Sequence, residues 1–360
     1  MVKKSMSHFI EYGEPGLFDE FLGELDAGAH ETPLMRVGKV VEWRLFEPEL
    51  LAAIEKEAKG AGGRPRFHPL LMFKILVLQR LNGLADDATS FQIIDRHSFR
   101  AFLGLTAADA VPDGQTIADY REELMKSGSF ERLFHLFLGH LQKSHGLGLG
   151  REGVMIDATF VEVPKQRNSR EDNAIIKEGK VPSEFTGKPH VGAHKDTDAR
   201  WTKKNGISYY GYKDHVKVDV ADKLILDGVT TSAEVHDSQP TALLIKEGDK
   251  DLWADSAYTG GKIQADLEGK NVYPQICEKG TRAAALTEEQ KKSNHQKSRV
   301  RSRVEHVFAQ MTGSMRALRQ RCIGFDRNDA LIKLTNLVYN MLRFEQIKRL
   351  NIRYSLPVMA

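Results

Sequence analysis

The chain has 360 residues, of which 41% are hydrophobic and 28% charged, the composition of a soluble globular protein with room for two or three domains. It contains no run of about eighteen apolar residues, and its first residues lack an apolar core, so we expect neither a membrane span nor a secretory leader. The two cysteines, Cys277 and Cys322, lie far apart in no metal-binding motif, which is typical of a cytoplasmic protein.

The net charge of +3 is unevenly distributed along the chain. Residues 1–60 carry 7 Lys/Arg against 12 Asp/Glu, whereas residues 164–217 carry 12 against 7 and residues 282–327 carry 11 against 4. Two basic segments favour a polyanionic partner, although solvated helix faces and loops would explain either segment alone.

Residues 1–145 have a helical pattern throughout and are expected to form an all-helical N-terminal domain. Apolar spacing predicts helices from Leu17 onward and over residues 40–58, followed by a glycine-rich linker at residues 60–65. The next helices are expected over Pro69–Gln79 (apolar nearly all round and therefore buried), Asp86–Leu103, Thr116–Lys126 with Asp113 as a cap candidate, and Ser129–Ser144.

The role of this helical domain stays open between two alternatives. Short helices joined by tight turns fit a helix-turn-helix that reads DNA, and they fit a dimerisation bundle equally well. Since the first 60 residues are acidic, residues 64–145 are the better candidate for DNA contact, through basic positions such as Arg64, Arg66, Lys74, Arg96, Arg100 and Arg121.

The central stretch is Val154–Pro164, a short run of β-branched and aromatic residues behind a glycine-rich break. It predicts a buried strand with one carboxylate, Asp157, in its middle. Because an unpaired buried carboxylate costs several kcal/mol, Asp157 should be paired, hydrogen-bonded or bound to a metal. The simpler alternative is an aspartate at a strand edge that bonds to a nearby loop.

The C-terminal part, residues 146–350, reads as a mixed α/β domain with both faces of its sheet covered. A long basic loop is expected at 165–206. We favour Asp237 or Ser238 as a helix cap over a His236–Asp237 metal or acid–base pair. The expected elements are strands Ser208–Val220 and Lys223–Ser232 in a hairpin, a helix from about Asp237 to Glu247, strand Leu252–Asp255, helix Tyr258–Leu267, strand Val272–Ile276, a capped helix after Thr287, and a final helix Asp329–Arg349.

Three carboxylates in this part are candidates for one metal site: Asp157 in its strand, Asp255 at the end of a second strand, and Glu305 at the margin of an apolar helix stripe. Two Mg²⁺ ions can clamp the attacking and leaving oxygens of a phosphoryl displacement, and Mg²⁺ prefers oxygen ligands. Without cations the three acids would repel one another. Arg299, Arg301 and Arg303 lie beside Glu305 and could hold phosphate oxygens, or they could form a solvated basic face.

An ordered set of motifs resembles the DDE transposases of bacterial insertion sequences, with the insertion sequence 5 family of the wider insertion sequence 4 group as the best match. The resemblance covers most of residues 17–345. Its motifs are Ile156–Phe160, Tyr210–Lys213, Val235–Gln239, Ala254–Tyr258 and Arg301–Phe308, preceded by Arg64-Pro65, Pro69–Lys74, Ser98–Leu105 and Pro112-Asp113.

This resemblance implies a ribonuclease H-like catalytic domain that uses two Mg²⁺ ions, with Mn²⁺ as a substitute, for DNA cleavage and strand transfer. Asp157, Asp255 and Glu305 match the catalytic and metal-binding triad, and Arg301 matches the basic residue one helical turn before the glutamate. Ser298 and Thr312 stand where the family motif has tyrosine and lysine, and Arg316 could replace that lysine. The candidate DNA-binding residues are Arg299, Arg301, Arg303, Arg316, Lys203 and Lys204.

The resemblance also implies partners: the element's terminal inverted repeats, the target DNA and a second copy of the chain, since two element ends need two active sites. Two alternatives remain at this point. One is a metal-dependent nuclease on the same fold without strand transfer, and the other is a catalytically inert DNA-binding regulator.

Overall fold

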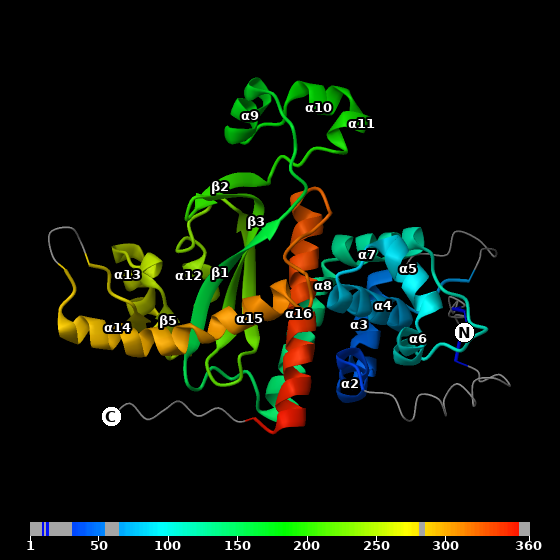
Figure 1. Cartoon of the computed structure of the whole chain (residues 1–360), viewed down its shortest axis with the longest axis horizontal. Coiled ribbons are helices and arrows are strands. Elements are labelled where there is room, and N and C mark those ends of the chain that lie inside the picture. The colour runs from blue at the N-terminus through cyan, green and yellow to red at the C-terminus, as the bar shows by residue number, and fades with distance from the viewer. Residues whose placement is uncertain (1–8, 11, 14–30, 55–64, 281–284, 353–360) are drawn as a thin grey trace, which may run out of the picture.

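The structure is a computed structural model that describes residues 9–10, 12–13, 31–54, 65–280 and 285–352. The helix expected from Leu17 and the glycines of the expected linker at residues 60–63 lie outside these residues. In the described part, helices occupy the N-terminal region and a mixed six-stranded sheet follows, flanked by further helices (Figure 1). None of the described helices combines the length and apolarity that a membrane crossing requires.

The N-terminal region is helical as expected, with finer divisions than the sequence indicates. The predicted helix over 40–58 begins instead at Glu47, because Pro48 fits the first turn of a helix but not its interior. The predicted helix Asp86–Leu103 is broken at Arg96, whose backbone is extended. The elements are α2 Pro33–Val40, η1 Trp43–Phe46, α3 Glu47–Ile54, α4 Pro69–Asn82, α5 Asp86–Asp95, α6 His97–Leu103, α7 Gly114–Lys126, α8 Ser129–His140 and η2 Leu141–His145.

Two local predictions for this region are confirmed. Helix α4 is buried along most of its length, from Pro69 to Gln79, as its nearly continuous apolar sequence indicates. Asp113 caps α7, with its carboxylate accepting from the backbone N–H of Thr116 at 2.7 Å.

The sheet is built around β1 (Val154–Glu162), the strand predicted at its centre. On one side β1 pairs antiparallel with β3 (Ile207–Asp219), and on the other side it pairs parallel with β5 (Asp251–Ala254). Beyond β5 lies β6 (Tyr273–Ile276), again parallel, while β4 (Ile225–Ser232) and β2 (Arg200–Lys204) both pair antiparallel with β3. The spatial order is therefore β2-β3-β1-β5-β6, and β4 also pairs with β3.

Alternation along β1 assigns its side chains to two faces of the sheet. Val154 and Ile156 pack in a core cluster with residues of β5 and of the adjoining helices α12 (Thr241–Leu244) and α13 (Gly261–Gly269). Met155 points the other way, into the large core that contains the N-terminal helices. By this period-two rule Asp157 lies on the same face as Met155.

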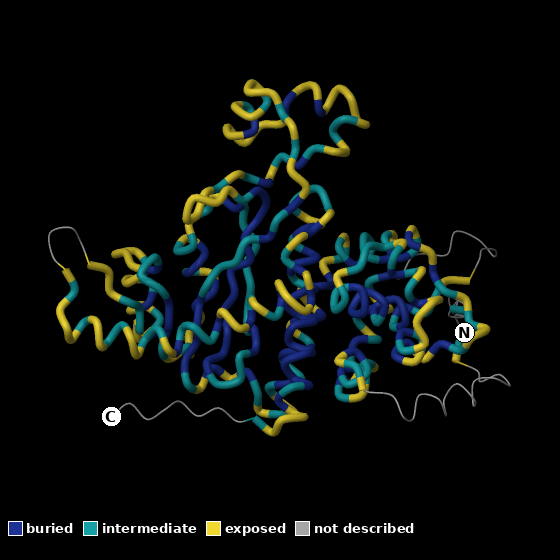
Figure 2. Tube along the Cα trace, in the orientation of Figure 1, coloured by how far each residue is buried: buried dark blue, intermediate teal, exposed yellow. Residues whose placement is uncertain are grey.

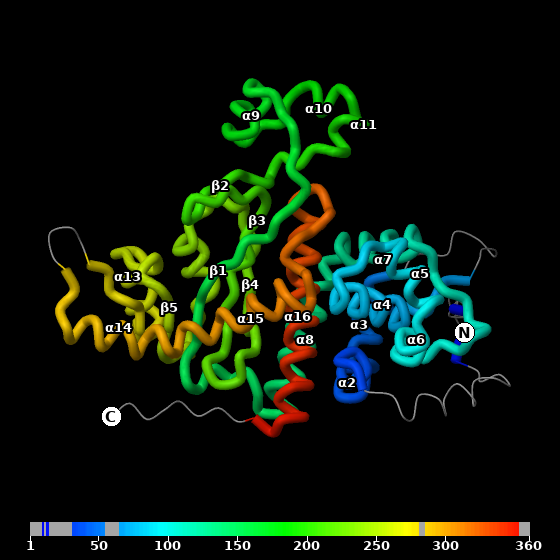
Figure 3. Tube along the Cα trace, in the orientation of Figure 1, coloured from blue at the N-terminus to red at the C-terminus, as the bar shows by residue number. Residues whose placement is uncertain are grey.

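The face of β1 that carries Asp157 is covered by helices from the end of the chain. Helices α14 (Glu288–Arg301) and α15 (Arg303–Thr312) form a rod, bent at Ser302, that crosses the strands from β5 towards α16 (Phe325–Leu350) (Figure 3). The Thr287–Gln290 capping box predicted at the start of α14 is present. Val300, Val304 and Val307 are buried, as their spacing predicts.

Helix α16 joins the two halves of the molecule. It packs against α2, α4, α7 and α8 on one side and against β4 and α15 on the other. It is consequently buried along nearly its whole length (Figure 2). The final helix of the sequence therefore contacts both the helical bundle and the sheet.

Two predictions for the C-terminal half of the chain were wrong. The segment 165–206 is not a plain loop, because it forms α9 (Arg170–Lys177), α10 (Ser183–Gly187), α11 (Pro189–Gly192) and β2, and the three helices project beyond the sheet (Figure 1). A Ser169–Asp172 capping box and the buried side chains of Ile176 and Phe185 stabilise this small helical unit. The helix expected from Asp237 is only α12, which begins after Pro240.

Candidate active site

Asp157 lies where β1 and β5 separate. The last ladder pair between these parallel strands is Met155 with Trp253, so Asp157 is the second residue of β1 beyond it. The Asp157 side chain is 15% exposed. Its Oδ1 accepts from the Ala158 N–H at 2.8 Å, and its Oδ2 accepts from Arg301 Nη1 at 3.2 Å. The predicted buried, partnered carboxylate is therefore found at the carboxyl end of a pair of parallel strands, a common location of binding sites in α/β proteins.

Asp255 directly follows β5 and so comes to the same edge of the sheet. Its Oδ1 accepts from the Ala257 N–H at 2.8 Å and caps the short helix η3 (Ser256–Tyr258). The charge of Asp255 is close enough to contribute to the raised pKa of Asp157.

Glu305 lies in the first turn of α15 and accepts a hydrogen bond from Arg301 Nη2 at 3.0 Å. Arg301 therefore bridges Glu305 and Asp157, which are 148 positions apart in the chain. The Glu305 side chain is 60% exposed, so the site opens to solvent on the α15 side.

Burial dominates the electrostatics of the site. It raises the pKa of Asp157 to about 6, with a further increase from Asp255, while the Ala158 N–H, Arg301 and Lys204 oppose this increase. At neutral pH the Asp157 carboxylate is therefore largely ionised but poorly solvated. Because its negative charge is poorly solvated, a bound metal cation would be stabilised beside it.

The three acids do not form a ready-made metal cage. Among the described residues, the group of potential metal ligands whose atoms all lie within 4.8 Å of one another is Glu42, His140 and His145, not the three acids. The Arg301 guanidinium lies between Asp157 and Glu305, in the position that a cation would need. The donor set of carboxylate oxygens fits a hard divalent ion, provided that Arg301 turns aside.

Tyr258 is a residue of the site that sequence reasoning missed. Its side chain is buried, and its hydroxyl has no hydrogen-bond partner among the described residues. Burial raises the pKa of this hydroxyl, and the charges of Asp157, Asp237 and Asp255 raise it further, which places Tyr258 close to the acids. The available signal was its position three residues after Asp255 in the Ala254–Tyr258 motif.

The structure also corrects the interpretation of Asp237. It caps no helix: its Oδ1 accepts from Lys213 Nζ at 2.7 Å, and its Oδ2 lies 3.9 Å from Lys204 Nζ. Lys213 and Lys204 both lie over the Phe160 ring, which stacks on Tyr209 at 4.2 Å between centroids. A Tyr–Phe–Lys–Asp cluster therefore borders the acids along β1 and β3.

The candidate DNA-binding residues do not all face the acids. Arg301 and Lys204 do, whereas the Arg303 side chain reaches the Ala221 carbonyl with Nη2 at 3.4 Å, in the turn after β3. Arg299 and Lys203 are exposed. Arg316 is also exposed, but it lines a surface pocket with residues of the N-terminal helices and is not part of the acidic site.

Most of the basic residues singled out in the N-terminal region are engaged internally. Arg121 Nη1 lies 2.6 Å from Asp86 Oδ1, Arg66 pairs with Glu123, and Arg100 donates to the Thr106 carbonyl. Lys74 packs over the rings of Trp43 and Phe102, and burial lowers its pKa to about 8. Only Arg66 and Arg96 among the described members of this set are exposed, and Arg66 is already paired with Glu123, which weakens the case for DNA contact through residues other than Arg96. Arg64 lies outside the described residues.

Comparison with known families gives two matches. The family model described as "Transposase DDE domain" matches residues 148–341, more than half of the 360 residues. The family model described as "Transposase domain (DUF772)" matches residues 24–123, within the helical N-terminal region. No solved structure matches the chain.

Proposed function

The chain belongs to the DDE-domain transposases of insertion sequences, and on that basis we propose that Asp157, Asp255 and Glu305 are its catalytic acids. At these residues the protein would cleave DNA at the ends of its element and join the freed 3′-hydroxyls to target DNA. Membership of the insertion sequence 5 family and a ribonuclease H-like classification of the mixed sheet are part of the same proposal.

The observation that carries the proposal is the convergence of the acids. Asp157 lies within β1 just past its ladder with β5, Asp255 directly follows β5, and Glu305 lies in the first turn of α15. One arginine, Arg301, donates to both Asp157 and Glu305. Nothing in the packing of β1 requires an acid at position 157, where burial disfavours the ionised form. A catalytically inert DNA-binding protein would gain nothing from a buried carboxylate that destabilises its fold.

Transposase DDE domains generally use divalent metal ions, and we propose two Mg²⁺ ions here, with Mn²⁺ as a substitute. Asp157, Asp255 and Glu305 would hold them through carboxylate oxygens. When bound, such ions lower the pKa of water and neutralise charge that develops on a transferring phosphoryl group.

Other side chains at the site would bind and orient the DNA. Arg301 lowers the pKa of Asp157 against the effect of burial and, once it turns from the carboxylates, would be positioned to bind a phosphate oxygen. The buried Tyr258 hydroxyl, which has no hydrogen-bond partner among the described residues, would donate to a nucleophile or a phosphate oxygen at the acids. Lys204 and the exposed Arg299 and Lys203 would hold the DNA backbone beside the site.

We further propose that the N-terminal helices recognise the terminal inverted repeats and that two copies act together on paired ends. The division of labour between residues 1–145 and 146–350 belongs to this proposal. The exposed Arg96 and Arg316, near one surface pocket, support a DNA-contacting surface on that side.

The decisive experiment compares wild type with Asp157→Asn on DNA that carries an element end, in Mg²⁺. We expect cleavage to fall by about a thousandfold or more, the scale for removal of a catalytic group, with DNA binding retained. Asp266→Asn, on α13 in the same half of the chain, is the matched control and should retain activity. Full activity of Asp157→Asn would contradict the assignment.

A second assay with pre-cleaved ends separates strand transfer from simple hydrolysis. Joined products that depend on Asp157 would establish transposition chemistry, whereas hydrolysis without joining would make the protein a nuclease.

A further inference from the structure

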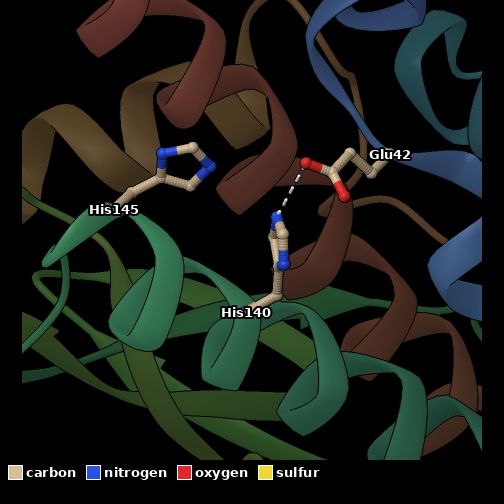
Figure 4. Close-up of side chains that lie close together, drawn as sticks. All are labelled: Glu42, His140 and His145. Atoms are coloured by element: carbon tan, nitrogen blue, oxygen red, sulfur yellow. Dashed lines mark ion pairs between the residues drawn. The ribbon is translucent and has the colours of Figure 1, made fainter.

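A second cluster of potential metal ligands lies on elements separate from the acids. Glu42, in the turn between α2 and η1, His140 at the end of α8, and His145 at the end of η2 point towards one another (Figure 4). Their ligand atoms all lie within 4.8 Å of one another, and His140 Nε2 is already 3.6 Å from Glu42 Oε1.

An irregularity in the helix creates this cluster. Residues five apart on a regular α-helix point about 140° away from each other, so His140 and His145 would diverge. The segment Leu141–His145 is instead a π-helical turn, in which residue i+5 follows above residue i. The two imidazoles consequently lie on one side, with ring centroids 5.4 Å apart.

Neighbouring groups hold the two rings in place. His145 packs against Phe344 of α16, with 4.8 Å between ring centroids. The Ser144 hydroxyl lies 3.5 Å from His140 Nδ1, which leaves Nε2 of that ring directed at Glu42. Metal-binding histidines commonly use one ring nitrogen for the ion and the other for such a partner.

The charge of the surroundings permits a divalent cation. The positive charge of Lys348, which lies over the Phe344 ring of α16, opposes a metal cation at this place. The negative charge of the Glu42 carboxylate offsets that of Lys348. Two neutral imidazoles and one carboxylate form a ligand set found around zinc, which takes His and Glu ligands at about 2 Å and leaves the fourth position for water. Because each ligand lies about 2 Å from zinc, two ligand atoms of one ion lie no more than about 4 Å apart. The ligand atoms of this cluster lie within 4.8 Å of one another, so small side-chain rotations would complete the site.

We propose that Glu42, His140 and His145 bind a divalent transition metal of the zinc class and that this ion fastens the α2–η1 turn to the end of α8. The ion is chemically distinct from the hard cations suited to Asp157 and its partners, because imidazole nitrogen favours Zn²⁺ over Mg²⁺. The proposal does not depend on the chemistry at the acids.

The test measures Zn²⁺ binding to the full chain in the presence of a competing chelator and excess Mg²⁺. Wild type should retain one more Zn²⁺ per chain than Glu42→Gln, His140→Gln or His145→Gln. His135→Gln is the matched control, because His135 lies on α8 with His140 and pairs with Glu131 but belongs to no three-ligand group within the described part of the chain. It should keep the wild-type stoichiometry.

Two further readouts make the outcome unambiguous. Co²⁺ substituted for zinc should give the visible absorption of a tetrahedral site in wild type and lose it in the three variants. Zn²⁺ should raise the Tm of wild type but not that of Glu42→Gln. Since the Glu42 side chain is 69% exposed, this variant should fold as wild type does in chelator even if a histidine variant does not. Equal zinc stoichiometry in wild type and Glu42→Gln would overturn the proposal.

Discussion

Arg301 donates to Asp157 across a distance of 3.2 Å between Nη1 and Oδ2, and this contact ties the last third of the chain to its central strand. The Asp157 side chain is 15% exposed and that of Arg301 22%, so both charges are largely withdrawn from water. The same guanidinium holds Glu305. Arg301 is therefore both a structural counter-ion in the free protein and the group that any bound cation must displace.

The first prediction concerns the stability of this contact. Arg301→Gln leaves the Asp157 carboxylate buried without its charged partner, so the free energy of unfolding should fall by about 1–3 kcal/mol at pH 7. Urea unfolding without metal measures it. Arg299→Gln, an exposed arginine on the same helix, is the control and should change stability by less than about 0.5 kcal/mol. Equal effects of the two variants would refute the structural role of Arg301.

The second prediction separates structure from chemistry at Tyr258. Its buried hydroxyl has no partner among the described residues, so Tyr258→Phe removes a polar group that contributes no bond to the fold. Stability should stay within about 0.5 kcal/mol of wild type or rise slightly. If the hydroxyl serves the acids, the cleavage rate should fall at least about tenfold, a modest loss for a positioned donor. An unchanged rate would restrict Tyr258 to packing.

The third prediction concerns pH and His215, a fully buried residue of β3 whose Nε2 lies 2.8 Å from the Thr231 hydroxyl. Burial lowers the pKa of this imidazole from 6.5 to about 4. The unfolded chain therefore takes up the proton first, and the stability contributed by neutral His215 is present above pH 6.5 and is lost as the pH falls towards 4. Each unit of difference between the unfolded and the folded pKa corresponds to 1.36 kcal/mol, so the full loss in the free energy of unfolding is about 3 kcal/mol.

The measurement compares urea unfolding of wild type and His215→Gln at pH 7 and pH 4.5. Between these two pH values, wild type should lose about 2 kcal/mol more than the variant. The variant is necessary because Asp214, whose pKa burial raises to about 7, has the opposite effect over much of the same range. Parallel losses in wild type and variant would show that His215 does not titrate as its burial indicates.

The fourth prediction concerns DNA contact. Arg299 and Lys203 are exposed, and each phosphate that a cationic side chain neutralises contributes about −0.9 to the slope of log K against log salt. Arg299→Gln combined with Lys203→Gln should flatten that slope by about two units. Arg44→Gln, an exposed arginine in the acidic N-terminal segment, should leave it unchanged. A double variant with the wild-type slope would remove both residues from the DNA surface.

Local sequence signals predicted the parts of the fold that depend on neighbouring residues. The strand around Asp157, the hairpin of β3 and β4, the buried α4 and the Thr287 cap all follow from spacing or capping chemistry. The breaks at Arg96 and Ser302 were missed, because no proline or glycine marks either position.

Features that depend on side-chain direction could not be read from the sequence. Arg301 and Arg303 are two residues apart, yet one reaches the acids and the other reaches the Ala221 carbonyl. Asp237 has the residue type of a helix cap but is held by Lys213, which comes from a distant position in the chain. The proximity of His140 and His145 depends on a π-helical turn. The sequence predicts an α-helix there, and in an α-helix the same two side chains would point in different directions.

The position of α16 has a consequence for the order of folding during synthesis. The N-terminal helices pack against a helix that ends at Leu350, so their shared core contains residues that are translated long after the N-terminal helices themselves. At about 5–20 residues per second, the ribosome needs on the order of 10–40 s after residue 145 to supply that helix. During this interval the apolar surfaces of α4 and α8 that later contact α16 have no partner within the nascent chain, which makes them a natural site for chaperone binding.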